Sequence, residues 1–164
     1  MTSKRVLLIL TLVFAVISAS ARSGFGIKAG VNFPAEDAKG SGVEALAGYH
    51  AGVAYNLDLP LGFSFQPSLM YSARGAGLGE KLTLGSLELM TSLQWGPDLL
   101  VFRPFVDVSP FACYGVNGRW DESGLSRFQY GIGLGGGVDI WHLQVVCRYN
   151  WNFGGVSLSL AYFF

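Results

Sequence analysis

The sequence of 164 residues has few charged side chains and no excess of either sign. Charged residues make up 13% of the chain, and 11 basic side chains balance 11 acidic ones, whereas a soluble domain carries about 25% charged residues. Without a basic excess there is no clustered positive face for a nucleic acid. Because 51% of the residues are hydrophobic and 14% are aromatic, the chain is also too apolar to be disordered.

Long apolar runs are missing beyond the N-terminus. None reaches the ~18 residues that a membrane-spanning helix needs, and the length is that of a single domain. At the start of the chain, Lys4 and Arg5 precede an apolar run over 6–17 and then four small residues. This order predicts a cleavable secretory signal peptide over 1–21, followed by one domain over 22–164.

The rest of the chain contains alternation with a period of two. Apolar residues take every second position and small or polar residues lie between them, which is typical of β-strands with two unlike faces. The pattern predicts eight strands, over 25–33, 47–58, 63–74, 86–95, 102–114, 128–140, 143–150 and 156–164. Short turns alternate with longer connections over 34–44, 75–82, 116–126 and 151–155. We therefore expect an all-β fold, an eight-stranded antiparallel up-and-down transmembrane β-barrel.

The sixth strand indicates which face lies inside. Its polar face consists largely of glycine, at positions 131, 133, 135 and 137. A row of glycines facing water would cost about 0.5–1 kcal/mol per residue and would not help solubility. Inside a narrow barrel the same row leaves space for long side chains. The glycine face is therefore expected inward, and the apolar face is expected toward lipid.

The inward positions also carry nearly equal numbers of cations and anions. Because a lone buried charge is costly, we expect these groups to form a structural charge network in the lumen. Its predicted members are Lys28, Asp58, Arg74, Glu88, Arg103, Asp107, Arg127, Asp139 and Arg148. Ordinary surface charge scattered along the strands is the alternative.

Prolines and tryptophans add two expectations. Pro67, Pro104 and Pro110 lie inside predicted strands, where each removes a backbone donor. We therefore expect bulges at these positions, and the facing around Pro104 and Pro110 is open to a slip of one residue.

The four tryptophans fall near strand ends at both ends of the predicted barrel, as the aromatic girdles of a membrane barrel do.

Groups for catalysis or metal binding are scarce. The motifs CxxC, HExxH and GxSxG are absent. Cys113 and Cys147 fall on opposite strand faces, so we expect free thiols. His142 lies in a predicted turn, and His50 lies within a strand without an adjacent serine–aspartate arrangement. His50 is therefore expected to be hydrogen-bonded inside the lumen, and we expect no catalytic residue, no cofactor and no metal.

Several segments also resemble a known family. They are FGIKAGVNF (25–33), GYHAG (48–52), FQPSLMYS (65–72), RPFVDVSP (103–110), GIGLGGGVD (131–139) and CRYN (147–150). In this order they are similar to the PorT-like outer-membrane β-barrel proteins common in Bacteroidetes, although the stretch 82–93 departs from that pattern. Tyr162 and the terminal Phe164 resemble the C-terminal signal that the barrel-assembly machinery reads. The resemblance implies a place in the outer membrane; most members have no defined activity, and a few serve protein secretion.

These features favour a small integral barrel of the cell outer membrane with a lumen filled by side chains, in a structural, accessory or interaction role. A general porin is not expected, because a water-filled channel needs about 16 strands. The expected partners are outer-membrane lipid, the barrel-assembly machinery and a protein bound through the longer loops. Two alternatives remain: a barrel enzyme that modifies outer-membrane lipid, and a soluble periplasmic, lipocalin-like barrel that binds a small apolar ligand.

Overall fold

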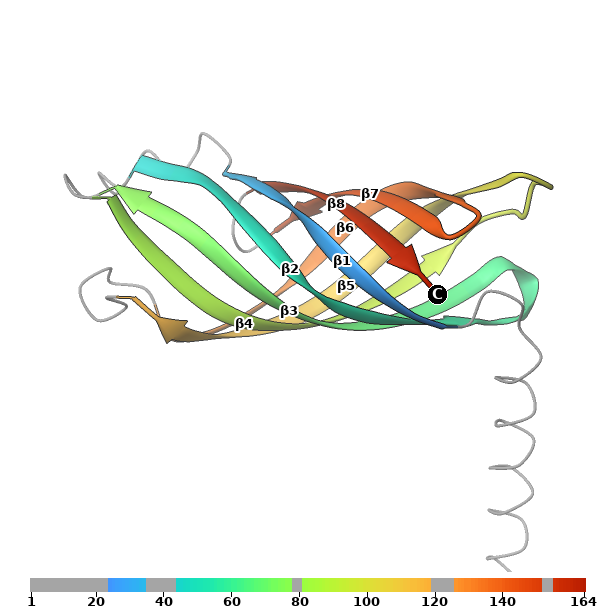
Figure 1. Cartoon of the computed structure of the whole chain (residues 1–164). Coiled ribbons are helices and arrows are strands. Elements are labelled where there is room, and N and C mark those ends of the chain that lie inside the picture. Colours follow the sequence, from blue (N-terminus) through green and yellow to red (C-terminus); the bar gives the residue numbers. More distant parts are fainter. Residues whose placement is uncertain (1–23, 35–43, 78–80, 119–125, 152–154) are drawn as a thin grey trace, which may run out of the picture.

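The computed structural model of the chain is a closed barrel of eight antiparallel strands. It describes residues 24–34, 44–77, 81–118, 126–151 and 155–164, so the predicted signal peptide lies outside the described residues. The strands are β1 (Gly24–Pro34), β2 (Glu44–Asp58), β3 (Phe63–Gly77), β4 (Lys81–Trp95), β5 (Phe102–Asn117), β6 (Phe128–Ile140), β7 (Leu143–Asn150) and β8 (Gly155–Phe163). Each strand pairs with the next, and β8 pairs with β1 (Figure 1). The predicted all-β, eight-stranded, up-and-down barrel is confirmed.

The strands form where the alternation predicts them, with one clear difference between β3 and β4. The segment 75–82 was expected to be a loop, but Gly77 pairs with Lys81 across the hairpin. That prediction is wrong, because backbone ladder bonds need no apolar alternation in order to form. No helix in the described part of the chain is long and apolar enough to cross a membrane.

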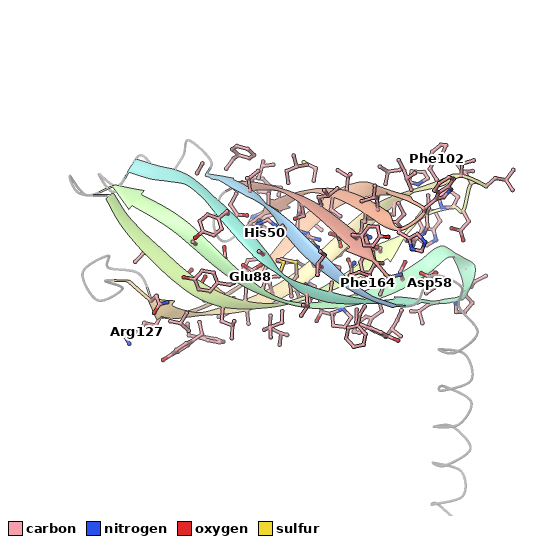
Figure 2. The ribbon with its side chains drawn as sticks, in the orientation of Figure 1. His50, Asp58, Glu88, Phe102, Arg127 and Phe164 are labelled. Atoms are coloured by element: carbon pink, nitrogen blue, oxygen red, sulfur yellow. The ribbon has the colours of Figure 1, made fainter. Side chains whose placement is uncertain are left out.

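The side chains face as the alternation predicts. Apolar residues of every strand are exposed on the outside, for example Leu89 at 58% and Val53 at 52%. The alternating residues of β5 are buried, including Arg103 and Asp107, so the facing of this strand does not slip. Figure 2 shows side chains projecting outward around the whole wall. The barrel is therefore apolar outside and polar inside.

The bulges expected at the strand prolines are wrong. Pro104 and Pro110 lie in one uninterrupted register of β5 against β6, and Pro67 lies in one of β3 against β4. The register shifts occur elsewhere, after Leu46 in β2 and after Gly85 in β4. Each proline is tolerated in its strand because the missing backbone N–H removes a hydrogen bond to only one of the two adjacent strands. Pairing of β3 with β2, and of β5 with β4, is interrupted at Pro67 and Pro110 without any change of register.

Candidate functional site

The lumen holds most of the charges that the sequence assigns to it. Five are buried, with side chains 1–6% exposed: Lys28, Glu88, Arg103, Asp107 and Arg148. Asp58 and Asp139 are half-buried. Arg127 is exposed just before β6 at the loop end of the barrel (Figure 2), away from the buried charges. The Arg74 side chain lies outside the part of the structure that is described.

A charge pair inside the lumen joins β7 to β5 across the intervening β6. Nε of Arg148 donates to Oδ2 of Asp107 at 2.7 Å, and Nη2 donates to the same oxygen. The remaining guanidinium donors contact Oγ of Ser92 at 3.2 Å and Sδ of Met90 at 3.0 Å. Oδ1 of Asp107 accepts a hydrogen bond from Ser109 at 2.7 Å. Since both partners are almost fully buried, their mutual contact offsets the cost of removing two charges from water.

Lys28 of β1 adds a second cation at the centre of the lumen. Its Nζ is buried and has no hydrogen-bond partner among the described residues. The charges of Arg148, Asp107 and Glu88 act on it. Two cations therefore face two anions, and the central lumen is close to neutral.

Three glutamines close the lumen toward the turn end of the barrel. Gln66 of β3 donates to Gln144 of β7 at 3.1 Å, Gln144 donates to Gln94 of β4 at 3.3 Å, and Gln94 donates back to Gln66 at 2.9 Å. We call this set the glutamine ring, and all three side chains are 0–2% exposed. The sequence did not predict this ring. The inward positions of the three glutamines were the available signal, but only charged inward residues were assigned to a network.

Arg103 braces the same end. Its Nη1 donates to Oδ2 of Asp139 at 2.9 Å, and its Nη2 donates to the carbonyl of Gly62 in the β2–β3 turn at 2.9 Å. Asp98, which is largely exposed, lies 3.9 Å from Nε. Asp139 also accepts from Gln144 at 2.8 Å, so the brace and the glutamine ring form one connected network.

Toward the loop end, His50 is held between two polar side chains. Its Nδ1 lies 3.0 Å from Oδ1 of Asn32, and its Nε2 lies 2.8 Å from Oγ of Ser159. The expectation that His50 is hydrogen-bonded inside the lumen is confirmed. The sequence neighbours of His50 give no sign of this serine, because barrel closure brings Ser159, 109 residues away in sequence, into contact with the ring.

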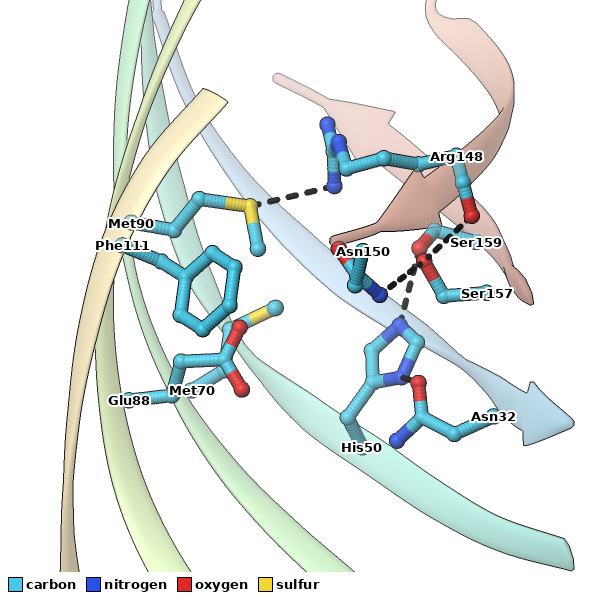
Figure 3. Close-up of a pocket in the computed structure, with 10 residues that line it drawn as sticks. All are labelled: Asn32, His50, Met70, Glu88, Met90, Phe111, Arg148, Asn150, Ser157 and Ser159. Atoms are coloured by element: carbon cyan, nitrogen blue, oxygen red, sulfur yellow. Dashed lines mark hydrogen bonds between the residues drawn. The ribbon is translucent and has the colours of Figure 1, made fainter. Parts of the chain in front are cut away.

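A small pocket lies beside His50 (Figure 3). Its apolar wall consists of Met70, Met90 and Phe111, and the rest of its lining is polar. Its volume of about 10 Å³ is that of one water-sized group. Oδ1 of Asn150, which lines the pocket, has no hydrogen-bond partner in the described residues. The part of the lumen that the structure describes is thus largely packed, and a small hollow lies near its loop end.

Glycines provide the space for these long side chains. A Cβ on Gly133 would overlap Cδ of Arg148, and a Cβ on Gly30 would overlap the ring of His50. Arg148 and His50 belong to the strands next to these glycines. At Gly133 the neighbouring side chain is the first obstacle to a Cβ, whereas at Gly30 the backbone carbonyl of Leu158 is closer still than the His50 ring.

Other candidate groups are separate from this cluster. Cys113 is buried, Cys147 is exposed on the outer face, and neither forms a disulfide. The described residues contain no group of three or more potential metal ligands. His142 lies exposed in the β6–β7 turn, where Nδ1 is 2.9 Å from the carbonyl of Phe163. The rings of Tyr162 and Phe164 pack edge to face at 5.4 Å on the outer face.

No family model matches the sequence, and no curated protein matches it.

Proposed function

We propose that this chain is a small integral outer-membrane β-barrel of the PorT-like kind, with a filled lumen and a structural, accessory or interaction role. The observation that supports this most is the orientation of the wall. Large apolar side chains are exposed on all eight strands, while Lys28, Asp107 and Arg148 are buried inside. A water-soluble barrel gains stability from the opposite arrangement, since burying apolar surface drives its folding.

Aromatic pairs at both ends of the wall also support the proposal. At the turn end, Phe63 contacts Trp95 with ring centroids 6.5 Å apart. At the loop end, Tyr149 contacts Trp151 at 5.9 Å. Aromatic residues at both ends of an apolar wall are the arrangement of the two girdles that flank the apolar band of a membrane barrel.

The contents of the lumen support a role other than general diffusion. The glutamine ring and the Arg148–Asp107 pair span the interior, and a barrel of eight strands is just wide enough to be filled by side chains. We therefore expect no conductance of porin size in a planar bilayer. A partner protein would bind through the longer loops. The barrel-assembly machinery would recognise Tyr162 and Phe164 at the C-terminal end.

Two matched arginine substitutions test the orientation of the wall. Leu89 lies mid-wall on β4 and Leu100 lies fully exposed in the β4–β5 connection. In a bilayer, Leu89→Arg is expected to lower the free energy of unfolding by about 2–4 kcal/mol, because the charge faces hydrocarbon. Leu100→Arg is expected to change it by less than about 0.5 kcal/mol. Urea unfolding of the protein in lipid vesicles measures both, and equal small effects would contradict the proposal.

Cell fractionation provides an independent test. The proposal expects the protein in the outer-membrane pellet, with a gel mobility that changes on heating. Recovery in the periplasmic extract would instead support the lipocalin-like alternative.

A further inference from the structure

We propose that Ser159, His50 and Asn32 form a hydrolytic centre that cleaves short-chain esters inside the lumen. Nε2 of His50 lies 2.8 Å from the Ser159 hydroxyl, and Nδ1 lies 3.0 Å from the Asn32 amide oxygen. A nucleophile bonded to a base, which is itself oriented by a third group, is the arrangement that activates serine in hydrolases. This activity goes beyond the proposed membrane function and does not depend on it.

The arrangement spans three neighbouring strands. His50 of β2 and Ser159 of β8 are both register partners of Gly30 on the intervening β1. The imidazole crosses β1 above Gly30, where a Cβ would overlap its Nε2 and Cε1 atoms. Glycine at this position therefore allows the histidine to reach a serine two strands away.

A further contact sets the protonation of the imidazole. Nδ2 of Asn32 donates to Oγ of Ser72 at 3.2 Å, so Oδ1 is the atom that faces His50. Because a carbonyl oxygen only accepts, Nδ1 of His50 carries the proton. Nε2 is then unprotonated and accepts the Ser159 hydroxyl, as a general base must.

The pocket beside these residues indicates the class of substrate. His50, Ser159 and Asn32 line it, opposite the wall of Met70, Met90 and Phe111 (Figure 3). Its volume of about 10 Å³ admits one water-sized group, which is space for the carbonyl oxygen of a small ester but not for its acyl or alcohol carbons. Asn150 lines the same hollow; one N–H of its amide donates to Ser157, and the second can stabilise an oxyanion. The acyl and alcohol portions would extend past the half-buried Asn32 and Asn150 toward the loop end.

The reaction is an ordinary two-step ester hydrolysis. Oγ of Ser159 attacks the ester carbonyl while His50 takes the hydroxyl proton and passes it to the departing alcohol. Water then attacks the acyl-serine, with His50 again accepting a proton and returning it to Ser159. The products are one alcohol and one carboxylic acid, and no co-reactant other than water is needed.

The test uses the full barrel, folded in detergent micelles, with two small reagents. Methanesulfonyl fluoride is expected to modify Ser159, identified by mass spectrometry of the digest, and 4-nitrophenyl acetate is expected to be hydrolysed. Ser159→Ala should abolish both signals. His50→Ala should lower the modification rate by about 10²- to 10⁴-fold. Gly30→Ala should also lower it, because it displaces the imidazole without removing any of the three groups.

Ser64→Ala is the matched control. Ser64 is a buried inward serine of β3 that does not line the pocket, and its hydroxyl has no hydrogen-bond partner in the described residues. The rates of modification and of ester hydrolysis in this control variant should stay within about twofold of those of the unmodified protein. Heat-dependent gel mobility shows that each variant is folded.

The unmodified, folded protein decides the matter even if a variant fails to fold. Labelling of a residue other than Ser159, or hydrolysis no faster than in Ser159→Ala, overturns the proposal. Failure of the membrane function is recognised separately, by fractionation and by the Leu89→Arg result.

Discussion

The two halves of the lumen both contain polar residues but differ in how completely side chains fill them. Toward the turn end, every amide of the glutamine ring both donates and accepts, and Arg103 braces the ring through Asp139. Toward the loop end, Oδ1 of Asn150 has no partner and a small pocket remains beside His50. One half is a closed plug, and the other retains space in which a ligand could be held.

Side-chain length explains the difference. Three glutamines are long enough to meet one another from β3, β4 and β7, and so they fill the lumen without a gap. Around the pocket near the loop end, four of the lining residues are short: Asn32, Asn150, Ser157 and Ser159. These cannot reach across the lumen, so the longer lining side chains, such as His50 and the methionines, only partly fill the space. Closure at one end and a hollow at the other follow from where the long amides lie.

The largest expected effect comes from removing the charge pair that joins the two halves. Asp107→Ala is expected to lower the free energy of unfolding by about 3–5 kcal/mol, because it leaves Arg148 buried without its carboxylate. Urea unfolding in micelles measures this loss. The double variant Asp107→Ala with Arg148→Met should recover most of it. A loss below about 1 kcal/mol would show that the pair does not support the fold.

A smaller effect is expected in the plug. Gln94→Ala should cost about 1–3 kcal/mol, since it removes a donor from Gln66 and an acceptor from Gln144, both of which stay buried. The control is Gln129→Ala, on the half-buried inward side of β6 outside the ring, with an expected change below about 0.5 kcal/mol. Equal costs for the two variants in the same unfolding assay would contradict a closed ring.

The smallest effect is expected in the open half. Asn150→Ala should cost less than about 1 kcal/mol, because its oxygen is unpartnered and its amide makes one long bond of 3.3 Å to Ser157. Thermal unfolding of Asn150→Ala and Gln94→Ala under the same conditions compares the stability lost in the two halves of the lumen. A cost for Asn150→Ala as large as that for Gln94→Ala would mean that both halves are equally well satisfied.

Much of the fold could be predicted because it depends on local alternation. The bounds of β6 and β7 agree with the predicted 128–140 and 143–150, and the inward facing of Arg103 and Asp107 follows from a period of two. The hairpin at Gly77 and the continuous pairing at Pro104 were missed. Both depend on backbone pairing, which leaves little trace in side-chain pattern.

The candidate site was predictable only in part. Lys28, Asp107 and Arg148 could be assigned to the lumen one by one, since burial of each depends on its own strand face. Their pairing could not be assigned, and neither could the glutamine ring. Arg127 shows the limit of alternation, because a residue beside a strand end can have the inward parity and still be exposed.

The sequence by itself determined which residues lie in strands and which face inward, because alternation is a property of each strand alone. Tertiary structure decided which inward groups meet. The contact of His50 with Ser159 requires the closure of β8 onto β1, the register that puts Gly30 between them, and the absence of a side chain at that glycine. Contacts of this kind depend on the stagger between strands, which no single strand encodes.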